Sequence, residues 1–344
     1  MQVWSSVMRM AERTSFPDVL MLAVVERLAR SDVRRLARLP ETAEAEFVAE
    51  MARLPIEALN GGAKTLHEEL PPEFFDLVLG PHRKYSCCRY PVATTSLAEA
   101  EMLALNETIE HAALADGQRI LELNGGWGSL ALHAAEQLPN ATVVCVTRSQ
   151  AQRRYVEAKA RERVLPNLSA VVADMNVFAT ADRFDRIVSV EMFGRVANWR
   201  ALLARARDWL EPDGRLFLNV FAHQTCCHRF DASHPVGWLA QHFLAGSLMP
   251  SHGLPHRFED LFEVEAEWRW SGANYRRTAL DWLGDFDSNR ARIDEILLQV
   301  YGDQAELWRR RWRLYFLAIA GWFGHAGGSE WGVSHYRMAP APRG

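Results

Sequence analysis

The chain has 344 residues, of which 49% are hydrophobic and 24% charged, and its formal net charge at pH 7 is −4. This composition predicts a soluble globular protein with a large core, organised as one large domain or two small ones. The slightly acidic balance gives no electrostatic reason to expect nucleic acid or an anionic membrane as a partner. No stretch reaches the roughly 20 apolar residues that a membrane-spanning helix needs, so we expect no integral membrane association and a cytoplasmic location.

The five cysteines form two adjacent pairs and a singleton: Cys87-Cys88, Cys226-Cys227 and Cys145. This spacing matches neither a disulfide framework nor a CxxC metal motif, so we expect reduced thiols and no bound metal. A metal site at His223, Cys226, Cys227 and His228 is a minor alternative, because adjacent cysteines do not easily face one tetrahedral ion.

The N-terminal region carries apolar residues at helical spacing from residue 18 to about 60, interrupted at Pro40. We expect one helix before this proline and a second over Glu44–Leu59. Neither helix carries obvious chemistry. We therefore interpret residues 1–65 as a helical cap that packs on the rest of the chain or on another subunit, as in a homodimer. Residues 66–90 show no clean period, which suits a loop over a pocket.

A glycine-rich turn follows a short apolar strand at Ile120–Leu123 and opens a helix at Ser129. Three of the five residues from Asn124 to Gly128 are glycine. Glycine lets the backbone approach a ligand closely, and the start of a helix offers free N–H groups. The order of strand, turn and helix therefore predicts a nucleotide or nucleoside site.

Strands and helices alternate through the central part of the chain, which predicts a doubly wound α/β sheet with ligand sites at the strand carboxyl ends. The expected strands are 120–123, 142–146, 169–172, 185–190, 215–221, 264–270 and 331–337. The expected helices between and after them are 97–115, 129–135, 150–162, 199–210, 278–301 and 304–323. Residues 66–344 would form one domain, in which about 223–262 is inserted as a mainly helical substrate cover together with the helical region at about 278–323.

Two of the predicted strand ends carry side chains suited to a nucleoside. At Asp174-Met175 a carboxylate can accept the adenine amino group while a thioether lies on the ring, although a helix cap and a packing methionine explain the pair equally well. The second strand ends without an acidic residue to bind a ribose diol, which argues against a dinucleotide. Thr147 and Gln152 offer polar groups to a ribose instead, and Ser149 is explained equally well as a helix cap.

Several short motifs, dispersed but in consistent order, resemble one family of enzymes. They are Leu70-Pro71-Pro72-Glu73-Phe74-Phe75, Tyr85-Ser86-Cys87-Cys88, Gly126-Trp127-Gly128-Ser129, Ala173-Asp174-Met175, Ser189-Val190-Glu191-Met192-Phe193, Met249-Pro250-Ser251 and Tyr275-Arg276-Arg277-Thr278. From about residue 66 to 338 the chain resembles the S-adenosylmethionine-dependent methyltransferases grouped with cyclopropane fatty acid synthases and coclaurine-type N-methyltransferases. The cysteine pair, the length and the Trp-rich end are closer to the N-methyltransferase branch.

The resemblance implies a Rossmann-like class I methyltransferase sheet with S-adenosylmethionine as cofactor. Tyr85, Ser86 and Gly126 would touch its methionine end. The full set of candidate cofactor contacts is Tyr85, Ser86, Glu122, Asn124, Gly126, Thr147, Gln152, Asp174, Met175 and Glu191. The candidate catalytic residues are Glu191, Tyr275, Cys87 and His223.

The chain departs from the family pattern at three places. Asn124 stands where the family has a glycine, and asparagine is the non-glycine residue that best tolerates a positive φ. Gly194 and Arg195 stand where the family places a Glu-His pair after Phe193, and a family histidine aligns with Asn219. In the cyclopropane synthases that glutamate belongs to a bicarbonate-binding base with a cysteine, a histidine and a tyrosine, of which the first and last match Cys87 and Tyr275.

The lost pair removes groups suited to proton abstraction near neutral pH, which disfavours cyclopropanation. Methylation of a neutral amine needs mainly alignment and a dry site. We therefore expect methyl transfer by in-line displacement to a small-molecule acceptor, most of all an amine nitrogen, with Glu191, His223 or His228 as base. The alternatives are a cofactor-binding relative with altered or no catalysis, in which Arg195 binds a substrate carboxylate or phosphate, and carbon methylation of a fatty-acyl or other lipid-like acceptor.

Overall fold

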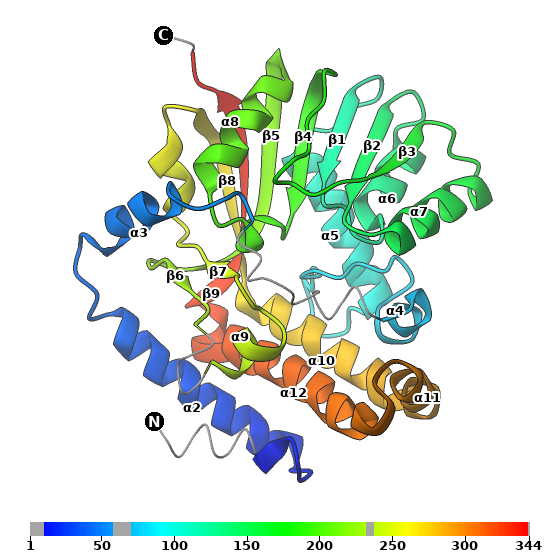
Figure 1. Cartoon of the computed structure of the whole chain (residues 1–344), viewed down its shortest axis with the longest axis vertical. Helices are drawn as coiled ribbons and strands as arrows, with labels where there is room; N and C mark the ends of the chain where they lie inside the picture. The colour runs from blue at the N-terminus through cyan, green and yellow to red at the C-terminus, as the bar shows by residue number, and fades with distance from the viewer. Residues whose placement is uncertain (1–9, 58–69, 232–236, 343–344) are drawn as a thin grey trace.

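The computed structural model describes residues 10–57, 70–231 and 237–342 (Figure 1). Its centre is a seven-stranded sheet in the order β3-β2-β1-β4-β5-β9-β8. The strands are β1 (Arg119–Leu123), β2 (Thr142–Thr147), β3 (Leu168–Val172), β4 (Phe184–Val190), β5 (Leu210–His223), β8 (Phe262–Ser271) and β9 (Trp331–Pro340). Strands β1 to β5 run parallel, and β9 is antiparallel to both of its neighbours. The predicted doubly wound α/β sheet is confirmed.

Helices cover both faces of the sheet, because successive strand residues point to opposite sides. Ile120 of β1 packs with α5 (Leu97–His111) and α6 (Ser129–Gln137) in one core cluster. Leu121 packs on the other face with α8 (Trp199–Trp209) and α3 (Ala43–Met51). Helix α7 (Gln150–Glu162) flanks β2 and β3. The chain is therefore layered as helix, sheet and helix.

Local capping sets where two of these helices begin. Ser96 and Glu99 form a reciprocal capping box at the start of α5. The Oγ of Ser149 accepts a hydrogen bond from the backbone N–H of Gln152 at 3.2 Å and caps α7. Ser149 is thus a helix cap, which is one of the two roles considered for it.

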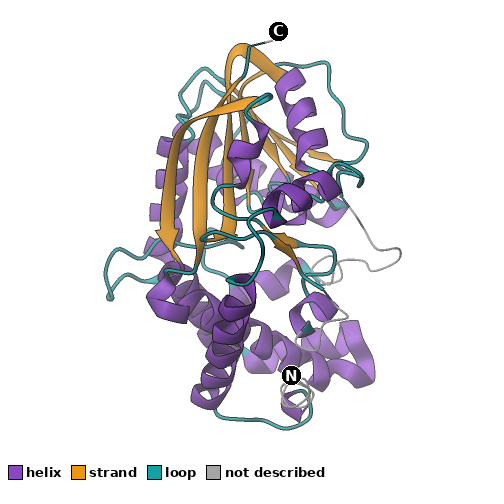
Figure 2. Cartoon of the chain, turned by 90° about the vertical axis from the view of Figure 1, so that its left-hand side faces the viewer, coloured by secondary structure: helices purple, strands orange, loops and turns teal. Residues whose placement is uncertain are grey.

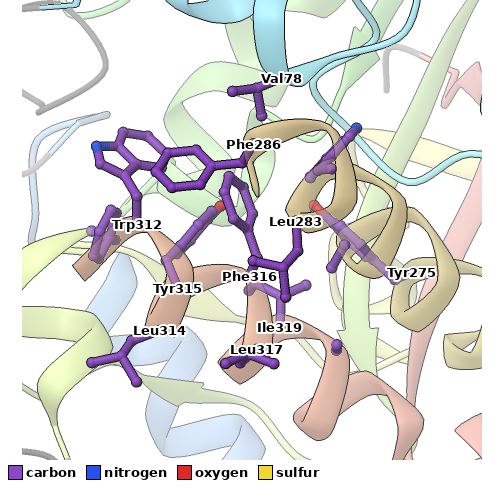
Figure 3. Close-up of a cluster of buried hydrophobic side chains, with 14 of the residues drawn as sticks. Val78, Tyr275, Leu283, Phe286, Trp312, Leu314, Tyr315, Phe316, Leu317 and Ile319 are labelled. Carbon is purple, nitrogen blue, oxygen red and sulfur yellow. The ribbon is translucent and has the colours of Figure 1, made fainter. Parts of the chain in front are cut away.

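A second group of helices, called the helical body below, lies at the end of the sheet where the parallel strands terminate (Figures 1 and 2). It consists of α2 (Asp18–Leu36), α4 (Pro72–Val78), α10 (Gly272–Ser288), α11 (Arg290–Tyr301) and α12 (Ala305–Gly324). Its core is rich in aromatic rings, such as Phe74 at 4.9 Å from Trp312 between centroids, and includes Tyr275 and Tyr315 (Figure 3). Gly321 of α12 lies so close to Val25 of α2 that a Cβ there would stand 2.6 Å from a valine methyl.

The structure differs from the expected elements at four places. Residues 72–78 form helix α4 within the expected loop, because Pro72 at the first helical turn loses no hydrogen bond there. The expected helix 44–59 ends at Met51, and residues 58–59 lie outside the described ranges. The expected helix 278–301 is two helices that meet at Asn289.

The fourth difference concerns residues 223–262. They contain only short elements, β6 (His228–Arg229), α9 (Trp238–His242), β7 (Leu248–Met249) and the 3-10 helix η3 (Leu254–Phe258). The helical part of the cover therefore comes from α10 to α12. In the ranges that the structure describes, no helix has the length and apolarity to cross a bilayer.

Candidate active site

A cavity of about 500 Å³ lies between the carboxyl edge of the sheet and the helical body. The turn after β1, the start of α7, the residues after β4 and the end of β5 line it from the sheet side. Residues 83–86, α2, residues 228–231, α9, α10 and α12 line it from the other sides. This is the edge at which an open α/β sheet binds its ligand.

The glycine-rich turn opens directly onto this cavity. Asn124, Gly126 and Gly128 have φ values of 54°, 55° and 76°, a region that L side chains rarely occupy. Asn124 therefore adopts the positive φ that asparagine was expected to tolerate there. Gly125 donates its N–H to Val146 O at 2.8 Å, and a Cβ there would stand 2.5 Å from the Cys145 sulfur, so this glycine is needed for space.

Glu122 lies on β1 just before the turn and is 3% exposed. Its Oε2 is buried and, among the described residues, accepts no hydrogen bond. Burial raises the pKa of its carboxyl to about 7. The carboxyl also interacts with the Cys145 thiol and the Ala131 backbone N–H, both of which oppose that rise. Its Oε2 can still accept an N–H group from a ligand.

Glu191 immediately follows β4, and its carboxylate is held on both sides. Its Oε1 accepts the backbone N–H of Cys87 at 2.9 Å, and its Oε2 accepts the Tyr275 hydroxyl at 2.7 Å. The backbone of Glu191 has a φ of 51°, a conformation that is uncommon for a residue with a side chain. Burial raises the pKa of this carboxyl, and the nearby Lys84 ammonium partly opposes that rise.

Lys84 is a buried cation that the sequence argument missed. Its Nζ donates to Ser86 Oγ at 2.5 Å and to the Cys87 carbonyl at 2.7 Å. Its charge acts on both Glu191 and Glu122. In the sequence, only its position directly before the Tyr85-Ser86 motif could have indicated that Lys84 belongs to the site.

Eight of the predicted site residues line this cavity: Tyr85, Ser86, Glu122, Asn124, Gly126, Gln152, Glu191 and Tyr275. Cys87 does not line it, because its thiol is fully buried against the Cys88 carbonyl, and its contribution is the backbone N–H to Glu191. The cysteine and tyrosine of the expected base therefore meet at Glu191 and not at position 194.

Three predicted cofactor contacts also lie outside the cavity wall. Thr147 is fully buried, and its Oγ1 faces the carbonyl oxygens of Val171 and Ser149. Asp174 is exposed and accepts the N–H of Asn176, while Met175 belongs to the core. All three remain at the carboxyl edge of the sheet, at the ends of β2 and β3.

The histidine predicted as a candidate base, His223, lies at the end of β5 and does not line the cavity. Its Nδ1 accepts the backbone N–H groups of Thr225 and Cys226, and burial lowers its pKa to about 4. His228 does line the cavity, but burial lowers its pKa to about 3, so its imidazole is a weak base.

The departures after Phe193 change the cavity wall. A Cβ on Gly194 would stand 2.3 Å from Cζ of Phe221, so the phenyl ring occupies the space of a side chain at 194. Phe221 and Arg195 both line the cavity. Asn219 lies outside it and bonds to Nε2 of the buried His335 at 2.8 Å.

Sequence reasoning also missed the contribution of the N-terminal region and of α12. Asp32 and Arg35 of α2 line the cavity, and so does Tyr315 of α12. Arg148 lines it too and forms an ion pair of 3.0 Å with the buried Glu57. These residues reach the cavity through the packing of helices, which short sequence motifs do not predict. In the described part of the chain, no three His, Cys, Asp or Glu side chains are grouped as metal ligands would be.

The family model described as mycolic acid cyclopropane synthetase matches residues 62–327, more than three quarters of the chain. The chain belongs to this family. It is an S-adenosylmethionine-dependent methyltransferase, as the motifs of the sequence indicate.

Two curated relatives and one solved structure illustrate its place in the family. (S)-coclaurine N-methyltransferase of Thalictrum flavum subsp. glaucum is 32% identical over 272 residues, 78% of this chain and 75% of the relative. Cyclopropane-fatty-acyl-phospholipid synthase of Escherichia coli (strain K12) is 27% identical over 260 residues, 75% of this chain and 63% of the relative. A crystal structure of coclaurine N-methyltransferase bound to N-methylheliamine and SAH is 26% identical, with a TM-score of 0.91 over 97% of this chain and 99% of that one.

The residues of the cavity fit the cofactor of this family. The Glu122 carboxyl, with its Oε2 unpaired, suits the ammonium of a methionine moiety. A Cβ on Gly126 would meet nothing within 4 Å, so the turn leaves room for a ligand there. Tyr85, Ser86 and Gln152 line the same cavity. When bound, S-adenosylmethionine supplies an electrophilic methyl group on its sulfonium.

Proposed function

We propose that this methyltransferase transfers a methyl group to the nitrogen of a small-molecule amine. One observation carries the proposal: the cavity holds a carboxylate, that of Glu191, which is fixed by Cys87 N–H and Tyr275 OH at the end of β4. The N-methyltransferase activity named for coclaurine N-methyltransferase supports an amine acceptor.

The arrangement suits the charge changes of N-methylation. A neutral amine becomes positively charged when it gains a methyl group, and a proton must then leave the nitrogen. An ionised Glu191 stabilises that developing charge and accepts the proton, because burial raises the pKa of its carboxyl toward the range of a general base. The two hydrogen bonds hold its oxygens in one orientation, which limits the reorganisation needed during the reaction.

The walls around Glu191 favour an apolar amine. Phe221, Trp322 and Phe323 line the cavity, and together with Tyr275 they exclude water from the reacting groups. Exclusion of water strengthens the interaction between Glu191 and a cationic nitrogen. His228 is a weaker candidate base, because its low pKa reflects a neutral ring that gains a proton poorly.

The proposal is tested by incubating the purified chain with S-adenosylmethionine and a panel of aromatic and aliphatic amines, and by measuring S-adenosylhomocysteine and the N-methyl product. We expect N-methylation, and we expect Glu191→Gln to lower kcat/KM by about a hundredfold or more, as loss of a general base does. Phospholipid vesicles with unsaturated acyl chains form the parallel arm. A methylated or cyclopropanated acyl chain would support the lipid alternative, and cofactor binding without any turnover would support a catalytically altered relative.

The cytoplasmic location and the homodimer stay proposals. Fractionation of cells and sedimentation of the purified chain are the direct tests.

A further inference from the structure

Six cationic side chains line the cavity: Arg35, Arg83, Lys84, Arg148, Arg195 and Arg229. Five of them interact with other described residues. Arg35 pairs with Asp32, Arg83 with Asp76 and Arg148 with Glu57. Lys84 donates to Ser86 Oγ and the Cys87 carbonyl, and Arg229 lies over the Phe47 ring at 5.2 Å. Within the described residues, the guanidinium of Arg195 has no ion pair, hydrogen bond or ring contact.

Arg195 is the last residue of the 3-10 helix η2 (Phe193–Arg195), which follows β4 and Glu191. Its backbone N–H donates to the Met192 carbonyl at 2.8 Å, which fixes the turn from which the side chain projects. The hydroxyls of Tyr85 and Tyr315 are hydrogen-bonded to each other. Arg195 interacts electrostatically with both phenols and with the ion pair of Arg148 and Glu57. A guanidinium with its donors unused therefore stands beside two phenols in the cavity that holds Glu191.

We propose that Arg195, assisted by the hydroxyl groups of Tyr85 and Tyr315, binds a carboxylate on the acceptor, so that the substrate is an amine that also carries a carboxylate. This inference rests on the proposed N-methyltransferase function and names its substrate class. A guanidinium binds a carboxylate by two parallel N–H donors, and a half-buried cation without an ion pair gains most from such a ligand.

Both the cofactor and the proposed acceptor carry a carboxylate. The position of Arg195 in the fold favours the carboxylate of the acceptor as its ligand. Glu122, Gly126 and Gln152, which fit the cofactor, belong to β1, the turn after it and α7. Tyr85, which the resemblance assigns to the methionine end of the cofactor, is hydrogen-bonded here to Tyr315 of α12. Arg195 follows β4 on the other side of the switch point between β1 and β4. Its neighbour Tyr315 belongs to α12, the helix that closes the cavity opposite the sheet.

The surroundings of Arg195 favour a carboxylate over a phosphate. Arg229 also lacks an ion pair among the described residues, but its guanidinium lies over the Phe47 ring. The single guanidinium of Arg195 matches the one negative charge of a carboxylate. The ring of Phe221 occupies the space of the missing side chain at Gly194, the neighbour of Arg195 in the chain, so the cavity wall there includes an apolar ring. An amino acid with an aromatic or aliphatic side chain combines these properties.

The test measures binding rather than turnover. The full chain, saturated with S-adenosylhomocysteine, is titrated calorimetrically with phenylalanine and with 2-phenylethylamine, which share the ring and the ammonium and differ in the carboxylate. We expect phenylalanine to bind about tenfold to a hundredfold more tightly, as one charge-assisted bidentate contact implies. Arg195→Gln should abolish this ratio, and Arg195→Lys should keep part of it because the charge remains without the planar fork.

Arg229→Gln is the matched control, since it removes another arginine of the same cavity, and it should keep the ratio. Equal affinities in the unaltered chain, or a ratio that responds to Arg229 and not to Arg195, would overturn the inference. Weaker binding of S-adenosylhomocysteine to Arg195→Gln with an unchanged phenylalanine ratio would also overturn it, because the cofactor carboxylate would then be the ligand.

Turnover is assayed separately. If the carboxylate preference depends on Arg195 but no amine is methylated, the carboxylate-binding role of Arg195 stands and the proposed function fails. If amines are methylated without any carboxylate preference, the proposed function stands and the inference fails.

Discussion

The hydroxyl of Tyr275 offers the sharpest test of the role assigned to Glu191. Tyr275→Phe removes the donor that lies 2.7 Å from Glu191 Oε2. The ring should stay in place, because it packs against Phe323 with a centroid distance of 4.5 Å. The carboxylate then retains the N–H of Cys87 as its remaining protein hydrogen bond among the described residues.

A hydrogen bond to a charged group contributes about 1.5–3 kcal/mol, and each pKa unit corresponds to about 1.4 kcal/mol. The hydroxyl donates to the ionised form of Glu191 and therefore lowers its pKa. Its removal should raise that pKa further. We expect kcat/KM for an amine to fall roughly tenfold to a hundredfold near neutral pH, with part of the loss recovered at higher pH.

The assay is the pH profile of kcat/KM, followed by S-adenosylhomocysteine formation. Its acid limb should move to higher pH in Tyr275→Phe, since a carboxyl with a raised pKa needs a higher pH to ionise. Tyr90→Phe is the matched control, because that hydroxyl donates to Asp281 at 2.8 Å but does not line the cavity. A Tyr275→Phe profile that coincides with that of Tyr90→Phe would refute the role of Glu191 as proton acceptor.

Three further predictions concern the turn and the wall of the cavity. Gly194→Ala should lower the free energy of unfolding in urea by about 1–3 kcal/mol through overpacking against Phe221, and the added Phe221→Leu change should restore most of it. Asn124→Ala should cost about 1–2 kcal/mol and weaken S-adenosylhomocysteine binding, whereas Asn124→Gly should be tolerated, because φ is 54° there. Burial raises the pKa of Glu122 to about 7 from an ordinary 4.5, so the folded chain binds the proton more tightly than the unfolded chain does. The free energy of unfolding of the cofactor-free chain should therefore fall by roughly 3 kcal/mol as the pH rises from 4.5 to 7. Glu122→Gln should remove that slope from the urea midpoints, and an unchanged slope would assign it to another group.

The sequence alone was sufficient for the sheet and for the position of its ligand-binding edge. Strand periodicity is a local property, so β1 to β5 and their carboxyl ends could be placed from apolar runs and turn residues. The tolerance of Asn124 for a positive φ follows from its own side chain, and the structure uses it. The family itself was identifiable because its motifs are short and contiguous, and the match over residues 62–327 bears this out.

Tertiary structure decided which side chains face the cavity and which partners they have. Cys87 and Glu191 meet although 104 positions separate them, and the contact is made by the backbone N–H of Cys87, which no side-chain motif reveals. His223 looked like a base from its place at a strand end, yet local backbone N–H groups take up its Nδ1. The isolation of Arg195 and the phenyl ring over Gly194 depend on how α12 and β5 pack, because a residue's partners are set by distances across the fold that sequence spacing does not encode.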